Sequence, residues 1–166
     1  MYNNAKDTVV MRIKYYLIIL GISMLPIIEL RGAIPYAAIF NIGFLEALPF
    51  AIIGNLIPVP FILLFFKFFF KKFRNAPLVG TVFTRVHNKA LKEADKIKNY
   101  AMWGLYIFVA IPLPGTGAWT GSVIASLLEM DNKKSFLAIF AGVITSGLIM
   151  GFVSYGLWDI VTALIK

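Results

Sequence analysis

Residues 26–35 read Pro-Ile-Ile-Glu-Leu-Arg-Gly-Ala-Ile-Pro and lie in the middle of an apolar stretch that runs from Tyr15 to Leu45. Ionisable side chains inside a membrane cost about 3 kcal/mol or more each, and proline and glycine interrupt helices. The stretch therefore cannot be one regular helix. We expect either a helix unwound at mid-membrane or a re-entrant hairpin of two half-helices, because irregular backbone survives at that depth only where protein or water satisfies it.

A second broken stretch, Ala101–Leu128, contains Pro112-Leu113-Pro114-Gly115-Thr116-Gly117. An unbroken apolar stretch follows each broken one, at Ala47–Phe66 and Phe136–Trp158, and each is close to the ~20 helical residues that cross a bilayer. Overall, 60% of the residues are apolar and 14% are charged, against about 25% charged in soluble domains. The sequence predicts an all-α, multi-pass integral membrane protein.

The two halves of the chain share the order of a broken stretch followed by an unbroken one. Gly32-Ala33 aligns with Gly117-Ala118, and after a shift of two or three residues Ala51–Gly54 aligns with Ala138–Gly142. Paired interruptions of this kind indicate an internal repeat with a site at its interface. We predict one membrane domain, 1–166, with inverted repeats at about 15–70 and 101–158, joined by a connector at 71–100.

The connector region carries most of the excess charge. Residues 67–98 hold nine basic and two acidic side chains, net +7 of the total +8. A cationic stripe at helical spacing predicts an interfacial helix, on the cytoplasmic side by the positive-inside rule and in contact with anionic lipids rather than nucleic acid. The stripe consists of Arg85, Lys89, Lys92 and Lys96.

Two topologies are open. Two re-entrant hairpins would put both termini outside and relate the halves by an inverted two-fold axis, whereas two full crossings would put both termini in the cytoplasm. The basic residues before the first apolar stretch, Lys6, Arg12 and Lys14, favour full crossings. The repeat and the helix breakers favour hairpins, which we prefer.

Glu29 and Arg31 are the first candidate site. On a regular helix residues i and i+2 point to nearly opposite faces, so we expect an unwound turn at Gly32, near Pro35, to let both face one cavity. The alternative is a solvated pair near the membrane interface. No metal site is expected, because cysteine is absent and the single histidine, His87, lies in the connector.

The second broken stretch has the composition of an anion site. Prolines precede the turn, glycines permit it, and hydroxyl groups lie where the next half-helix begins and its amides favour negative charge. Arg31 would complete a clamp for phosphate or carboxylate, with Trp119 as a stacking wall or simple apolar filler. The alternative is close helix packing through small residues. The candidate residues are Pro114, Gly115, Thr116, Gly117, Trp119, Thr120 and Ser122.

At Glu29–Pro35 and Pro112–Gly121 the chain resembles the small multidrug export family of bacterial and archaeal membrane proteins. That family is similar to the DedA/VTT superfamily, which implies two facing re-entrant hairpins, movement of polyprenyl phosphates or phospholipids, and Glu29 as a proton-coupling residue. The arginines expected in the second DedA hairpin are missing, and Thr116 and Trp119 stand in that turn. The resemblance places the chain in a prokaryotic plasma membrane.

We expect a transporter that exports or flips an amphipathic substrate, either a drug-like cation or a phosphate-bearing lipid, by ion coupling without a cofactor. The alternative is a non-transporting assembly or regulatory protein, in which Glu29 would tolerate neutral substitution. The usual motifs of membrane enzymes are absent, including His-Glu-x-x-His and a histidine placed to activate Ser122. At 18.5 kDa the chain is small for a transport path, which is compatible with a homodimer.

Overall fold

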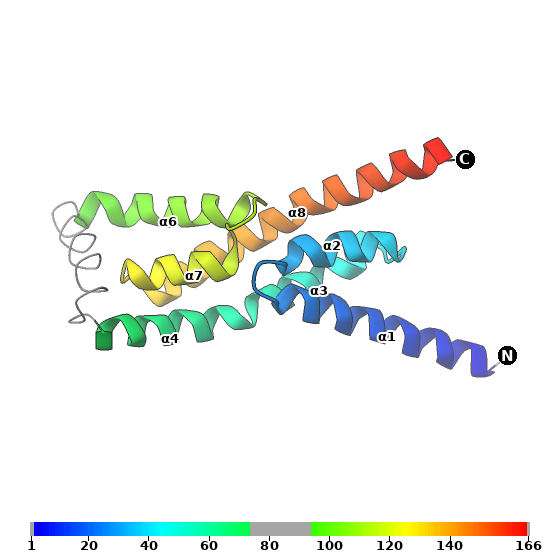
Figure 1. Ribbon diagram of the computed structural model, residues 1–166, viewed down its shortest axis with the longest axis horizontal. Coiled ribbons are helices and arrows are strands. Elements are labelled where there is room, and N and C mark those ends of the chain that lie inside the picture. The colour runs from blue at the N-terminus through cyan, green and yellow to red at the C-terminus, as the bar shows by residue number, and fades with distance from the viewer. Residues whose placement is uncertain (1, 74–93, 166) are drawn as a thin grey trace. The chain divides into compact units, whose positions relative to one another are not determined.

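The computed structural model describes residues 2–73 and 94–165, with side chains at 10–70, 72 and 100–156. Every regular element in these ranges is a helix (Figure 1), which confirms the all-α prediction. The predicted cationic stripe and His87 lie outside the residues whose side chains are described. The helices are α1 Tyr2–Met24, α2 Glu29–Ile39, α3 Phe44–Leu56, α4 Pro58–Phe73, α6 Ala94–Ala110, α7 Ala118–Leu127 and α8 Asn132–Ile165.

Among the described residues, two helical segments are long and apolar enough to cross a membrane. One is Phe44–Phe70, in which α4 follows α3 with a single residue between them, and the other is Asn132–Gly156 within α8. They contain most of the two unbroken stretches predicted from the sequence. About a third of each hydrophobic window is buried within the protein, 33% and 39% respectively. Most of their apolar surface is therefore available to lipid.

The chain divides into two compact units, and each is described by itself. The first unit is Met1–Ile57 together with Ile144–Lys166, and the second is Pro58–Val143. The first unit thus contains α1, α2, α3 and the later part of α8, while the second contains α4, α6, α7 and the start of α8. Each unit is built from both halves of the sequence.

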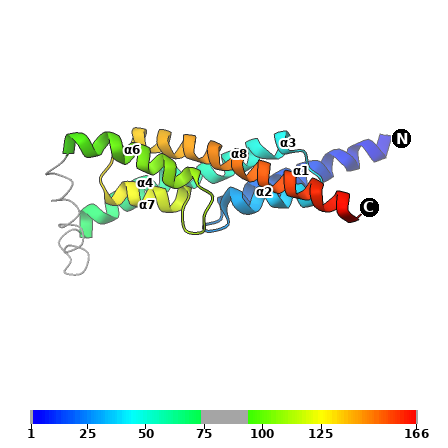
Figure 2. The ribbon, with the colours of Figure 1, turned by 90° about the horizontal axis from the view of Figure 1, so that it is seen from above.

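In the first unit, α1, α2 and α3 all pack on one another (Figure 2). Gly54 of α3 lets the two backbones approach, since a Cβ there would collide with the carbonyl oxygen of Leu20 in α1. One turn further along α1, the Ser23 hydroxyl donates to the carbonyl oxygen of Ala51. The close approach of α1 and α3 therefore depends on a missing side chain and a buried hydrogen bond.

In the second unit, α7 packs on α4 and α6. The Ser126 hydroxyl donates to the carbonyl oxygen of Leu63 at 3.2 Å. Gly142 of α8 lets α6 approach closely, because a Cβ there would lie 2.7 Å from the Cβ of Val109 and 3.0 Å from the carbonyl oxygen of Tyr106. Tyr106 and Leu20 each lie four residues before the end of their helix. The two units thus repeat the same kind of glycine contact.

Local structure recurs at a spacing of 88 residues. Helices α2 and α7 end at Ile39 and Leu127, and α3 and α8 begin at Phe44 and Asn132. In residues 2–73 and 94–165, six residues have φ in the left-handed region, and they form three pairs with this spacing (129 minus 41 is 88). The pairs are Ile27 with Gly115, Glu29 with Gly117, and Asn41 with Glu129.

Side-chain contacts to the loops recur with the same spacing. The Tyr155 hydroxyl of α8 donates to the carbonyl oxygen of Ile42 at 2.6 Å, in the loop after α2. The Lys67 ammonium of α4, 88 positions before Tyr155, donates to the carbonyl oxygen of Met130 at 3.4 Å, in the loop after α7. In each unit, a side chain from a span in the other half of the sequence thus contacts a loop: the loop after α2 in the first unit and the loop after α7 in the second.

Candidate functional site

The first break lies earlier than the sequence predicted. Helix α1 ends at Met24 and α2 begins at Glu29, so the unwound residues are 25–28. Gly32 and Pro35, the expected breakers, both lie inside α2, and the prediction of an unwound turn at Gly32 is therefore wrong. Glycine weakens a helix without forbidding it, and the Gly32 N–H makes the helical hydrogen bond to the carbonyl oxygen of Ile28 at 3.2 Å. The missing Cβ also leaves room for the side chain of Ile28.

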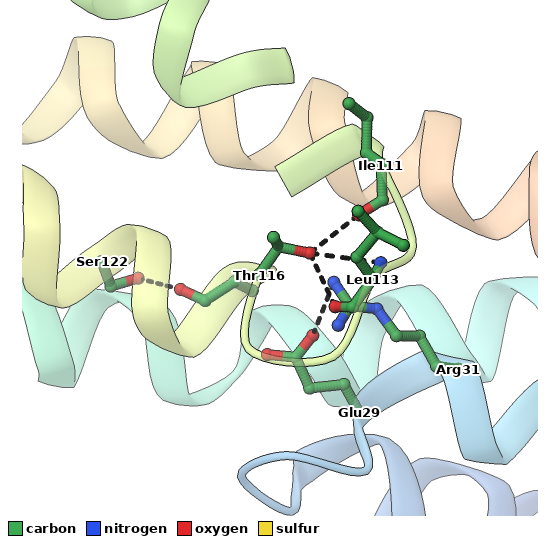
Figure 3. A network of polar contacts seen from close by, with 7 residues as sticks. Glu29, Arg31, Ile111, Leu113, Thr116 and Ser122 are labelled. Atoms are coloured by element: carbon green, nitrogen blue, oxygen red, sulfur yellow. Dashed lines mark hydrogen bonds and ion pairs between the residues drawn. The ribbon is translucent and has the colours of Figure 1, made fainter. Parts of the chain in front are cut away.

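Glu29 and Arg31 do come together, by a different route from the one expected. Glu29 opens α2 with φ at 51°, outside the right-handed helical region, so the i, i+2 geometry of a regular helix does not hold here. Its carboxylate Oε2 lies 4.0 Å from Arg31 Nη2, and the two side chains are 2% and 11% exposed (Figure 3). The first hairpin thus contains a buried pair of opposite charges at the start of a half-helix.

The second break covers residues 111–117, between α6 and α7. Gly115 and Gly117 have φ of 84° and 116°, which confirms that glycine permits this turn. The Thr116 hydroxyl lies 2.8 Å from the carbonyl oxygens of both Ile111 and Leu113, and it accepts the Leu113 N–H at 3.3 Å (Figure 3). Thr116 therefore holds the turn together.

The start of α7 carries the other candidate side chains. Ser122 is fully buried, and its hydroxyl donates to the carbonyl oxygen of Ala118 at 2.6 Å. Trp119 is half-buried, whereas Thr120 and Pro114 are exposed. Glu29, Arg31, Gly32 and Pro35 belong to the first unit, and the remaining candidates, from Pro114 to Ser122, belong to the second. Within the described residues, no cluster of three or more His, Cys, Asp or Glu side chains could hold a metal ion.

The 88-residue spacing changes which positions are equivalent. Sequence alignment matched Gly32 with Gly117, but the residue equivalent to Gly117 is Glu29, and the residue equivalent to Gly115 is Ile27. Matching Pro26 with Pro114 would have given this register, since they are also 88 positions apart. Ile27 and Glu29 therefore adopt left-handed conformations at two positions where the second half of the chain has glycine.

Ile27 is a residue that the sequence analysis missed, and its strain is testable. A β-branched residue at φ 74° is a conformational outlier, and the left-handed conformation costs about 1–2 kcal/mol for a residue with a Cβ. We expect Ile27→Gly to raise the free energy of unfolding by about 1 kcal/mol, measured by denaturant titration in micelles. Ile53→Gly, at an exposed position inside α3, is the control and should lower it.

Together, the two apolar spans and the two broken segments with their polar turns indicate a helical membrane protein. The chain belongs to the family described as "Putative small multi-drug export protein", whose sequence profile matches residues 29–149. The matched range begins at Glu29, directly after the first break, and includes the second break. No curated protein and no solved structure matches the chain significantly. The resemblance to the DedA superfamily stays a prediction.

Proposed function

We propose that the protein is a transporter that exports or flips an amphipathic substrate across the plasma membrane of a prokaryote, with Glu29 exchanging a proton. The observation that carries this proposal is the burial of Glu29, which is 2% exposed and lies at a strained backbone position beside Arg31. Strain of this kind persists only where the surrounding structure maintains it, and it concentrates at functional sites. The chain's own second half uses glycine at the equivalent position.

Proton exchange at Glu29 follows from the cost of burying charge. A carboxylate in an apolar environment is stabilised when a cation is near and takes up a proton when the cation is withdrawn or neutralised by another anion. An anionic group that binds Arg31 would therefore favour protonation of Glu29, and its departure would favour release. In this way substrate binding and proton binding become coupled.

The turn before α7, which belongs to the second unit, is a second proposed binding segment. Gly115 and Gly117, both with positive φ, directly precede the N-terminus of α7. The backbone amides at a helix N-terminus favour an anionic group. Thr120 in the first turn of α7 is exposed, so its hydroxyl is accessible to a ligand. We propose that Thr120 contacts the substrate, with Thr116 and Pro114 shaping the turn and Trp119 forming an apolar wall. Ser122, a candidate contact from the sequence, is buried and bonded to Ala118, so its proposed role is to shape the start of α7. In the first unit, Arg31 would bind an anionic group, and Gly32 and Pro35 would shape α2.

Loop contacts support a re-entrant topology for both hairpins. Helix α4 leads into the connector and α6 leaves it, and Lys67 near the end of α4 contacts the loop that follows α7. The chain after α7 therefore returns to the half of α4 that leads into the connector. In the first unit, Tyr16 of α1 donates to Glu46 near the start of α3 at 2.7 Å. With a cytoplasmic connector, the halves would form an inverted repeat with both termini outside.

Cysteine labelling tests this topology, since the chain has no native cysteine. Leu45 and Lys133 are exposed and lie 88 positions apart, each in the first turn of its span. We expect Leu45→Cys to react with an impermeant maleimide in intact cells and Lys133→Cys to react only after permeabilisation. Full crossings would put both positions outside, so labelling of Lys133→Cys in intact cells would overturn the re-entrant proposal.

Transport itself is tested in proteoliposomes with an imposed pH gradient. One preparation is given a lipophilic cation and the other a polyprenyl phosphate, and both substrate and proton movement are followed. The proposal requires gradient-driven movement of one of the two, accompanied by protons. A non-transporting assembly or regulatory protein would move neither, and that result would contradict the proposal.

A further inference from the structure

We propose that a pocket at the loop end of the first unit binds organic cations through aromatic rings and the Glu46 carboxylate. The pocket has a volume of about 310 Å³ and lies between α1 and the loop that joins α2 to α3. Its role in transport rests on the proposed function, but the binding does not. The lining residues are Arg12, Tyr15, Tyr16, Phe40, Asn41, Ile42, Gly43 and Glu46.

Aromatic rings and a carboxylate are the groups that hold a quaternary ammonium ion in proteins. The Tyr16 hydroxyl donates to Glu46 Oε2 at 2.7 Å, and the Tyr16 ring stacks on Phe50 with centroids 4.7 Å apart and planes 2° apart. The rings of Tyr15 and Phe40 lie 5.4 Å apart. These contacts fix the carboxylate and the rings before any ligand arrives, which lowers the entropic cost of binding.

Arg12 is the cation that a ligand would displace. Its Nη1 lies 3.5 Å from Glu46 Oε2, but the two side chains are 63% and 49% exposed. An exposed ion pair contributes little, so an organic cation could replace the guanidinium at small cost. Such a cation would also contact the rings of Tyr15 and Phe40. The ligand class is therefore a compact organic cation that carries methyl or alkyl groups around its charge.

The second unit does not repeat this chemistry. Counting 88 positions onward, Lys134 stands at the position of Glu46 and Leu128 at the position of Phe40. A lysine repels cations, and leucine offers no π face. These two positions of the second unit thus lack the groups that would hold a cation. Leucine at the position of Phe40 also suggests Phe40→Leu as a substitution that would weaken the pocket.

Titration of choline, followed by saturation-transfer difference NMR, tests the pocket in the full chain solubilised in maltoside micelles. We expect choline to bind at least about tenfold more tightly than 3,3-dimethylbutan-1-ol, its neutral isostere. Glu46→Gln, which keeps an acceptor for Tyr16, should weaken choline binding by about tenfold, and Phe40→Leu by about threefold. Arg12→Gln should tighten it by about threefold, because the competing cation is gone.

Several outcomes would overturn the pocket. Equal affinities for choline and its isostere would show that the pocket does not recognise positive charge. Unchanged binding in both Glu46→Gln and Phe40→Leu would show that choline binds elsewhere. Weaker binding in Arg12→Gln would mean that the ion pair only supports the fold. Glu29→Gln separates this inference from the proposed function: it should bind choline as the unmodified chain does, even if no transport is found.

Discussion

Glu29→Gln is expected to lower proton-driven transport at least about 100-fold, the smallest loss that removal of a proton-transferring group commonly causes. Glutamine has nearly the shape of glutamate, but its amide does not take up or release a proton at physiological pH. Glu129→Gln is the matched control, because Glu129 is an exposed carboxyl group with a similarly left-handed backbone, φ 51°. It should transport like the unmodified chain.

A second substitution separates lost coupling from lost folding. Glu29→Gln alone leaves the guanidinium of Arg31, which is 11% exposed, without its carboxylate, and breaking a buried pair costs about 3 kcal/mol or more. Adding Arg31→Gln should recover most of that stability but none of the transport. Denaturant titration and the proteoliposome assay measure the two effects. Transport retained by Glu29→Gln would exclude proton coupling at this residue.

Gly54→Ala is expected to destabilise the protein by about 3 kcal/mol, the upper range for overpacking a well-packed contact. The added Cβ would collide with the carbonyl oxygen of Leu20 and would lie 3.0 Å from the Cβ of Ser23. Backbone atoms cannot rotate away as a side chain can, so α1 must move. That movement would also break the buried hydrogen bond from Ser23 to Ala51.

Gly21→Ala provides the control on the neighbouring helix. Gly21 lies in α1 with open space around its missing Cβ, so alanine should stabilise the helix by about 0.5–1 kcal/mol. The two variants therefore should change the free energy of unfolding in opposite directions, which denaturant titration in micelles measures. Equal effects would show that α1 does not pack against Gly54 as described.

The fold was predictable where the signal is a simple property of composition. Long apolar runs predicted the spans that begin at Phe44 and Asn132, and paired interruptions predicted two breaks. The position of the first break was not predictable, because Gly32 and Pro35 are helix breakers by propensity while Ile28 fills the space beside Gly32. Propensity is a weak guide to the exact end of a helix, because local contacts such as this one also decide it.

The site was predictable in its residue types and not in its geometry. Buried charge in an apolar stretch identified Glu29 and Arg31, and hydroxyl residues near glycine identified the second turn. Nothing in the sequence indicated that Glu29 itself would adopt the left-handed conformation, because that conformation is expected at glycine. Likewise, only the contacts of Tyr16 and Arg12 mark Glu46 as part of a pocket.

The composition of the units bears on biogenesis. Because the first unit includes Ile144–Lys166, its earliest helices must wait for the last part of the chain to be synthesised before they find all their neighbours. The second unit needs no residue beyond Val143, so all of its helices are synthesised before the first unit is complete. Newly synthesised chains would therefore pass through a stage in which α1, α2 and α3, with Glu29, exist before their carboxy-terminal neighbour.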